Sequence, residues 1–368
     1  MQRTFALVAA LSIVATGAQA QRAWQTEVGV QGGYTRIVAA GLGADPTDII
    51  GLPGFNLGPL LPASPGIYAI IPWKDKIAVD LDFGVSQLNT GVTSITLFQL
   101  GARGDYAVTK KVYAGAGAGI GYVENAGTSE TQLGLQAAVG YRLGLSNSLK
   151  GNVEFRTTFW GNTQNVGAID TYALLFRVGA TPHRSAAPAR RAGASNARAG
   201  AWTPLLGVSA GYASIHAVGG GDVSAIAFPG YGAGLANIVG PAITLPPTLF
   251  AILPIGKKIA IEPGVDLHRT QASGTTTFLG NVSGRLNYAV HGGWYGAAGV
   301  NLNYVKQSGA SAATRTGANV AWGYRFPFWG ALGGRVELNY TMYRPNTDLA
   351  TPATNIVGLM FGTTMSLR

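Results

Sequence analysis

The residues that could carry chemistry in this 368-residue chain are few, and most of them are charged. Lys, Arg, Asp and Glu make up 11% of the sequence, and there are four histidines and no cysteine. Without cysteine, a disulfide framework, a thiolate metal site and a lipid-modified cysteine anchor are excluded. Four scattered histidines do not predict a transition-metal site. We therefore expect no metal and no other cofactor.

One candidate nucleophile stands in a suggestive motif. The run Gly207-Val208-Ser209-Ala210-Gly211 fits the G-x-S-x-G pattern of hydrolases, but that motif works only on a strand-to-helix elbow. Ser209 instead lies within an unbroken strand pattern. His216 and His268, the latter close to Asp266, are the possible partners, and no motif ties a serine to them. We expect a protein that is not an enzyme, and a lipid hydrolase or acyltransferase remains the less favoured alternative.

Four glycines at alternate positions, Gly115, Gly117, Gly119 and Gly121, resemble a phosphate-binding loop only superficially. Their period is two and no helix follows, so the dinucleotide interpretation fails. Glycine at every second position keeps one face of a strand thin.

The elements that position these residues are predicted to be strands. In the stretch 77–86, Ile77, Val79, Leu81, Phe83 and Val85 alternate with small or charged residues, and only an extended strand separates such positions onto two faces. A related stretch, 259–268, follows 182 residues later. Further matches, such as Gly140-Tyr141-Arg142 with Gly323-Tyr324-Arg325, indicate a duplication.

Each half divides into about eight strands. The expected ranges are 24–39, 66–73, 77–89, 94–109, 112–125, 130–145, 149–162 and 169–181, then 202–217, 247–255, 258–271, 274–290, 294–307, 314–327, 333–346 and 354–367. Long loops are expected at 40–65 and 219–246. Short, often basic turns alternate with longer connections, as periplasmic turns alternate with extracellular loops in membrane barrels.

The strand faces opposite the apolar ones hold charges of both signs with small residues between them, which suits a narrow interior in which the ions pair. Arg103 and Asp105, for example, share the face opposite Leu100 and Tyr106. The residues expected in this lumen charge network are Asp80, Asp82, Arg103, Arg142, Glu154, Arg156, Glu262, Asp266, Arg285, Arg325, Arg335 and Glu337.

Alternation alone fits a soluble barrel as well, so other features must decide. Charged residues are scarce against a typical share of about 25%, and no apolar run after the N-terminal segment reaches the ~20 residues of a spanning helix. Aromatic residues near strand ends resemble interfacial girdles: Trp24, Tyr106, Tyr122, Tyr141, Trp202, Tyr288, Trp294, Tyr304, Trp322 and Tyr324. We expect an all-β fold, a transmembrane antiparallel up-and-down β-barrel.

The expected domains follow from composition. Residues 1–20 are typical of a secretory signal peptide, with cleavage near Ala20, and residues 21–182 and 201–368 form the two barrel repeats. Residues 183–200 form an Ala/Arg/Ser/Pro linker that holds much of the net charge of +10. Because the charge is concentrated there, we expect no nucleic-acid partner.

At this point the chain resembles the small outer-membrane β-barrel family, the OmpA-like or opacity-protein-like transmembrane domain, present twice. The resemblance implies location in the bacterial outer membrane, with lipid and the barrel-insertion machinery as partners. Such barrels commonly end in an aromatic residue, whereas this chain ends Met365-Ser366-Leu367-Arg368.

Two tandem eight-stranded barrels are favoured over one sixteen-stranded barrel, because eight strands leave an interior that side chains fill. The expected role is structural, surface display or slow passage of small solutes. A general diffusion porin is the alternative.

Overall fold

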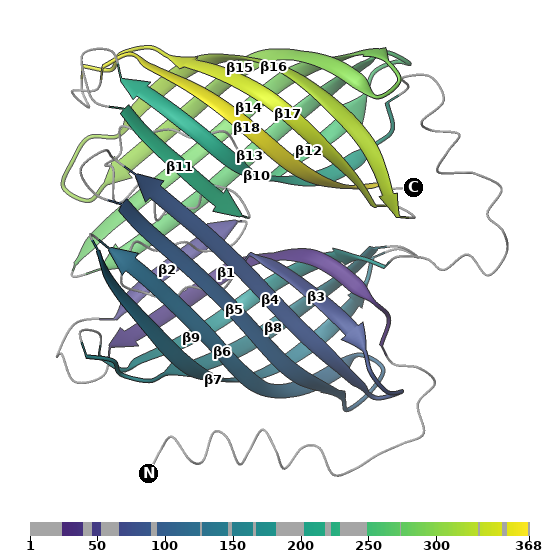
Figure 1. Ribbon diagram of the computed structural model, residues 1–368, viewed down its shortest axis with the longest axis vertical. Coiled ribbons are helices and arrows are strands. Elements are labelled where there is room, and N and C mark those ends of the chain that lie inside the picture. The colour runs from purple at the N-terminus through teal and green to yellow at the C-terminus, as the bar shows by residue number, and fades with distance from the viewer. Residues whose placement is uncertain are drawn as a thin grey trace, which may run out of the picture.

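The computed structural model is built from antiparallel β-strands (Figure 1). It describes residues 24–39, 46–52, 66–89, 94–125, 127–145, 149–164, 167–181, 202–217, 222–228, 249–272, 274–329, 332–347 and 352–366. No helix among these residues is long and apolar enough to cross a membrane. The expected signal peptide (1–20), the expected linker (183–200) and the last two residues lie outside the described residues.

The chain forms two closed barrels of eight strands each. The first closes where β1 pairs with β9, and the second where β10 pairs with β18. The first contains β1 (Glu27–Ala39), β3 (Ile67–Pro72), β4 (Ile77–Asn89), β5 (Ser94–Ala107), β6 (Val112–Asn125), β7 (Thr128–Gly144), β8 (Leu149–Trp160) and β9 (Ile169–Ala180). The second contains β10 (Leu205–Ala217), β12 (Leu249–Pro254), β13 (Ile259–Ala272), β14 (Thr275–His291), β15 (Trp294–Gln307), β16 (Ala313–Trp329), β17 (Leu332–Tyr343) and β18 (Thr354–Ser366).

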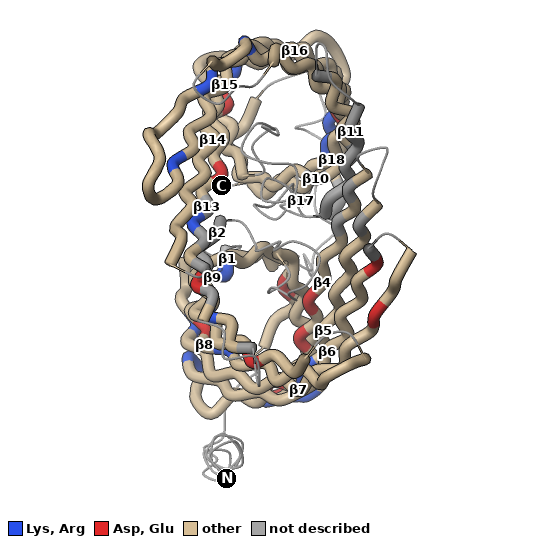
Figure 2. Tube along the Cα trace, turned by 90° about the vertical axis from the view of Figure 1, so that its left-hand side faces the viewer, with Lys and Arg blue, Asp and Glu red and all other residues tan. Residues whose placement is uncertain are grey.

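Two further short strands join the barrels. β2 (Thr47–Leu52) pairs with β1 of the first barrel and with β13 of the second. β11 (Asp222–Phe228) pairs with β10 of the second barrel and with β4 of the first. Figure 2 shows the resulting walls, which run without a break from one barrel to the other through β13, β2 and β1 on one side and β11 and β4 on the other.

The molecule is therefore divided differently at its two ends. At the end with the lysine-bearing turns 73–76, 108–111 and 255–258, here called the lysine-turn end, β3 and β12 close two separate barrels. Toward the opposite end, β2 and β11 take the place of β3 and β12. There, seven strands of each barrel join with β2 and β11 into one ring of sixteen strands.

A glycine marks the point where β1 and β10 each change partner. β1 pairs with β3 through Val30 and with β2 from Gly33 onward, and β10 pairs with β12 through Val208 and with β11 from Gly211 onward. A Cβ on Gly33 would lie 2.1 Å from the Leu174 carbonyl oxygen, and one on Gly211 would lie 2.2 Å from that of Leu359. Only glycine permits this close approach of neighbouring strands.

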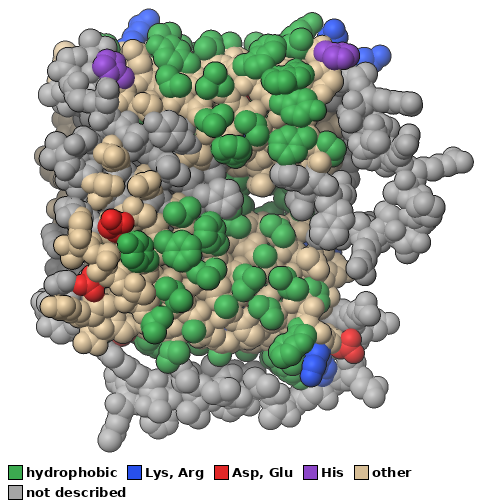
Figure 3. Space-filling model, viewed as in Figure 1, with side chains coloured by type: hydrophobic (Ala, Val, Ile, Leu, Met, Phe, Trp, Pro, Cys, Tyr) green, Lys and Arg blue, Asp and Glu red, His purple; other side chains and the backbone are tan. Residues whose placement is uncertain are grey.

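Apolar side chains face outward and polar ones face inward. On β7 the neighbours Gln132 and Leu133 are 6% and 67% exposed, and β8 exposes 52% of Phe155 beside the fully buried Glu154. Hydrophobic side chains cover much of the barrel walls in Figure 3, where Lys and Arg lie near the edges. This is the inverse of a soluble barrel, and it is the arrangement of a transmembrane β-barrel.

Two sequence expectations need correction. The expected loops 40–65 and 219–246 contain β2 and β11, which are six and seven residues long and end in or near Gly- and Pro-rich sequence. Trp24 and Trp202 are not girdle residues, because both are only 4% exposed and point inward. Other members of the predicted girdle, such as Tyr288 and Trp322, are half exposed on the outer wall.

Candidate functional site

The lumen of the first barrel is occupied by a cluster of buried ions centred on Arg103 and Glu154. Arg103 donates from Nη2 to Glu154 Oε2 and to Asp80 Oδ2, each at 2.7 Å, and from Nε to Asp105 Oδ1 at 2.6 Å. All four side chains are 1% exposed or less. The residues come from β4, β5 and β8, so the cluster spans the lumen from wall to wall.

Arg177 of β9 completes this cluster. It donates from Nη1 and Nη2 to the two carboxylate oxygens of Asp80, at 2.6 and 2.8 Å, and its guanidinium carbon lies 3.8 Å from the centre of the Tyr68 ring. Such two-pronged pairing fixes the guanidinium in position. A third guanidinium, Arg156, donates to Glu154 Oε1 at 2.8 Å and to Asp82 Oδ2 at 3.1 Å.

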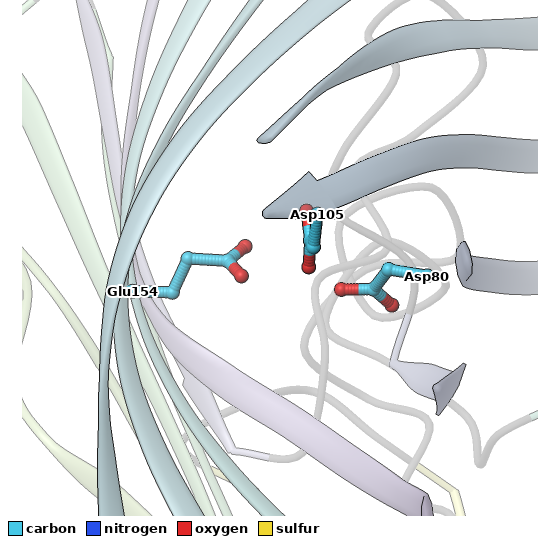
Figure 4. Close-up of side chains that lie close together, drawn as sticks. All are labelled: Asp80, Asp105 and Glu154. Atoms are coloured by element: carbon cyan, nitrogen blue, oxygen red, sulfur yellow. The ribbon is translucent and has the colours of Figure 1, made fainter. Parts of the chain in front are cut away.

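The cluster also contains the arrangement of carboxylates that most resembles a metal site among the described residues. Asp80, Asp105 and Glu154 have oxygens within 4.8 Å of one another, and Figure 4 shows the three side chains converging from separate strands. Arg103 contacts all three, and Arg177 contacts Asp80 and Glu154. Because guanidinium groups already neutralise these carboxylates, the residues fit an ion-pair network better than a cation site.

Small residues make room for these side chains. A Cβ on Gly115 would lie 1.9 Å from Asp105 Oδ1, so the glycines of β6 leave space for the Arg103–Asp105 pair. A Cβ on Gly140 would lie 2.1 Å from the Tyr113 ring, whose hydroxyl donates to Glu154 Oε2 at 2.7 Å. The prediction that alternate glycines keep a strand face thin is confirmed.

The second barrel repeats the arrangement with fewer ions. Arg285 donates to Glu337 Oε1 and to Glu262 Oε1, each at 2.6 Å, and Arg335 donates to Glu262 Oε2 at 2.8 Å. The hydroxyl of Tyr295 donates to Glu337 at 2.7 Å. Gly323 makes room for the Tyr295 ring as Gly140 does for Tyr113: a Cβ on Gly323 would lie 2.5 Å from the Tyr295 ring.

One guanidinium comes from different strands in the two barrels. In the first, Arg177 on β9 lies directly across from Asn152 on β8; in the second, Arg335 on β17 lies directly across from Gly362 on β18. Arg335 nevertheless lies 3.6 Å from the Phe250 ring centre, as Arg177 lies over Tyr68. The charge has moved to the opposite member of a cross-strand pair while its position over the aromatic ring is kept.

A cation–aromatic stack lies toward the lysine-turn end of each lumen. The guanidinium of Arg142 lies 3.8 Å from the Trp24 ring centre, and that of Arg325 lies 3.6 Å from Trp202. The Trp24 indole donates to the Lys76 carbonyl oxygen at 2.9 Å, and the Trp202 indole donates to that of Lys258 at 3.0 Å. These contacts tie the segment before each first strand to a lysine-bearing turn.

The structure thus brings most of the predicted network together in two groups, one in each lumen. Asp80, Asp82, Arg103, Glu154 and Arg156 lie in the first ion cluster. Glu262, Arg285, Arg335 and Glu337 form the second. Arg142 and Arg325 lie apart from these clusters in the tryptophan stacks, and Asp266 is buried on the same face of β13 as Glu262.

Sequence reasoning left out several members of the first cluster. Arg177 alternates with the outward-facing Leu174 and Phe176, so the period of β9 could have placed it inside. Asp105 was placed on the inward face but not in the network. Glu27, which accepts from Tyr68, lies in the first residues of its strand, where only a short stretch of pattern was available.

The candidate hydrolase residues do not converge. Ser209 is buried in the second lumen, where Arg335 Nη2 donates to its Oγ at 3.1 Å. His216 lies seven residues further along the same strand, and it is exposed. An odd spacing places the two side chains on opposite faces of a strand. The side chain of His268 lies outside the described residues.

A cavity of about 20 Å³ is lined by the second ion cluster together with Ser209, Phe250 and Asn339. That volume holds about one water molecule. In the first lumen, Arg103, Arg177, Asp80 and Glu154 are at most 2% exposed. Buried ion pairs occupy the middle of both barrels.

Comparison with known proteins gives structural likeness only. Neither the protein-family models nor the curated protein sequences give a match. Among solved structures, the CymD monoaromatic hydrocarbon channel is similar with a TM-score of 0.31 and 10% identity, covering 95% of this chain and 90% of that one. A Pseudomonas aeruginosa FadL homologue has a TM-score of 0.27 and 13% identity, covering 94% and 91%. Scores and identities at this level assign no family and no function to the chain.

Proposed function

We propose that the protein is an integral bacterial outer-membrane protein with a structural or surface-display role, and that its lumens pass small solutes only slowly. The observation that supports this role most directly is the pair of buried ion clusters. A guanidinium held by two or three carboxylates blocks the lumen, and removing one partner leaves an uncompensated buried charge. Such a cluster stabilises a closed barrel and does not provide a continuous path for water.

The outer-membrane location is supported by the outward apolar face and by the signal-peptide pattern at residues 1–20. In this proposal the partners are outer-membrane lipid and the barrel-insertion machinery, and the protein is not an enzyme. The last described strand, β18, ends at Ser366 and exposes Leu359 and Phe361 outward.

A general diffusion porin is the second candidate, and one observation favours it. β2 and β11 join the barrels into a ring of sixteen strands toward one end, and rings of that size can enclose an aqueous channel. The same ring leads, toward the lysine-turn end, into two separate barrels whose lumens hold the ion clusters. We therefore propose a shared vestibule above two closed lumens.

Conductance in a planar lipid bilayer tests this proposal. We expect the wild-type protein to show no stable large steps. As a comparison, Glu262→Ser combined with Arg335→Ser removes both members of one ion pair and leaves Arg285 paired with Glu337. This variant should show small steps through the second barrel. Large, stable steps from the wild-type protein would contradict closed lumens and favour the porin.

A further inference from the structure

A cleft lies between the two barrels, outside both lumens. Its volume is about 250 Å³, and strands of both barrels line it. Val28 and Val30 of β1 and Val178 of β9 form one wall, and Leu206 and Val208 of β10 form part of the other. The lining is almost entirely apolar, with two threonines of β18 among the exceptions. Figure 3 shows a gap between the two barrels on the face in view.

The topology makes this cleft unavoidable. Toward one end, β2 and β11 bridge the barrels, but below that level β3 and β12 close each barrel on itself. The outer walls of the two separate barrels then face each other. Because both walls are convex, they diverge, and their side chains leave a space between them. Gly29, Gly207 and Gly333 also line the cleft.

The position of the cleft determines what can fill it. Val28 is 41% exposed on the outer wall, and the cleft continues the same outward face that carries Leu174 and Phe361. The cleft has room for several water molecules, each of which takes up ~30 Å³. Its apolar walls nevertheless offer water few hydrogen-bond partners, so water fills it poorly. An unfilled cleft of this size would also lose dispersion contacts on both walls. Because the cleft opens on the lipid-facing wall, hydrocarbon is the medium available to fill it.

The lysine-turn end carries positive charge that favours a lipid with an anionic headgroup. The turns 73–76 and 255–258 contain Lys74, Lys76, Lys257 and Lys258, with one acidic residue, Asp75. Their backbone carbonyls hold the indoles that precede β1 and β10, two of the strands that line the cleft. The ammonium groups of Lys74, Lys76 and Lys258 also lie 5.5–5.9 Å from aromatic ring centres of the outer wall. Basic side chains beside interfacial aromatic rings attract anionic phosphate groups.

We propose that the cleft binds an acyl chain of an anionic phospholipid, whose phosphate contacts these lysine turns. The lipid fills the space that the exchange of β3 and β12 for β2 and β11 leaves open. It binds the two barrels together at the end where no strand joins them.

Native mass spectrometry of the full chain tests the site by counting the phospholipids that each chain retains. The protein is first exchanged into vesicles of phosphatidylglycerol or of phosphatidylcholine with the same acyl chains. Val178→Trp fills the cleft, and Leu174→Trp, on the same face of the same strand but outside the cleft, is its matched control. We expect the wild type and Leu174→Trp to retain one more phosphatidylglycerol per chain than Val178→Trp. Replacement of the four turn lysines by Gln should abolish the preference for phosphatidylglycerol over phosphatidylcholine.

Equal retention by Val178→Trp and Leu174→Trp would overturn the proposal, and so would a dimer mass that shows a second copy seated on the cleft. An unchanged headgroup preference after the lysine replacements would overturn the assignment of the phosphate. A measurement without substitutions guards against misfolding of the variants: the wild type, imaged by electron cryomicroscopy in phosphatidylglycerol nanodiscs, should show a tubular density between β1 and β10. An empty cleft in that map would also refute the proposal.

Discussion

Glu154 is the most heavily bonded carboxylate described in the first lumen. It accepts from Arg103 at 2.7 and 3.1 Å, from Arg156 at 2.8 Å, from Arg177 at 2.9 Å and from Tyr113 at 2.7 Å. Glu154→Gln preserves the shape but removes the charge, and it directs an amide donor at guanidinium donors. Breaking a buried ion pair from one side costs about 3–5 kcal/mol. We expect a loss of that size in the free energy of unfolding.

Urea titration in lipid vesicles, followed by tryptophan fluorescence and extrapolated to zero denaturant, measures this loss. Glu124→Gln is the matched control, because Glu124 lies near the end of β6, outside the ion cluster, and accepts a 3.3 Å bond from Tyr122. It should change stability by less than about 0.5 kcal/mol. Combining Glu154→Gln with Arg103→Gln should cost less than the sum of the two, with a coupling of about 0.5–3 kcal/mol. A loss below about 1 kcal/mol for Glu154→Gln, or strict additivity in the double variant, would refute the ion-pair account.

Three further outcomes follow from the geometry. Gly140→Val drives a side chain into the Tyr113 ring and should lower the free energy of unfolding by about 1–3 kcal/mol in the same titration. Gly144→Ala, whose added Cβ meets nothing within 4 Å, should lower it far less. Equal effects of the two substitutions would contradict the packing of Tyr113 against Gly140. Leu135→Arg places a charge on the lipid face and should reduce stability in vesicles by about 2–4 kcal/mol if the site lies near the bilayer midplane, while a neutral result would argue against a lipid-facing β7. The fragment 21–182 lacks β11, so the outer part of its β4 keeps β5 as a neighbour but loses the pairing on its other edge. The fragment should unfold at lower urea than the first barrel of the full chain, and equal midpoints would show that the strand exchange adds no stability.

The periodicity of the sequence was enough to predict the strands of both barrels. β4, for instance, spans Ile77–Asn89, as the alternation of Ile77, Val79 and Leu81 indicates. The reason is physical: a wall with lipid on one side and packed ions on the other imposes a strict period of two on every strand that crosses it. The side of the wall on which Arg103 or Glu337 lies is fixed by that period alone.

β2 and β11 could not be predicted from the same signal. They are short, and each has one pairing partner that is distant in sequence: β2 pairs with β13 and β11 with β4. Strand exchange between barrels depends on which edges are left open, and a local pattern carries no information about that. The inward tryptophans were missed for a related reason, because Trp24 and Trp202 precede their strands and are oriented by Arg142 and Arg325 rather than by alternation.

The claim on which the account depends is that apolar residues face lipid while packed ions close each lumen. Neighbouring residues on one strand test it: Leu135 and Gln136 in the first barrel, and Leu302 and Asn303 in the second. Because the chain has no cysteine, each can be replaced singly by Cys, spin-labelled and examined in vesicles by collision with oxygen and with a water-soluble nickel complex. We expect labels at Leu135 and Leu302 to meet oxygen but not nickel, and labels at Gln136 and Asn303 to meet neither. Strong nickel accessibility at Gln136 or Asn303 would reveal a water-filled pore, and nickel accessibility at Leu135 or Leu302 would show that the wall does not face lipid.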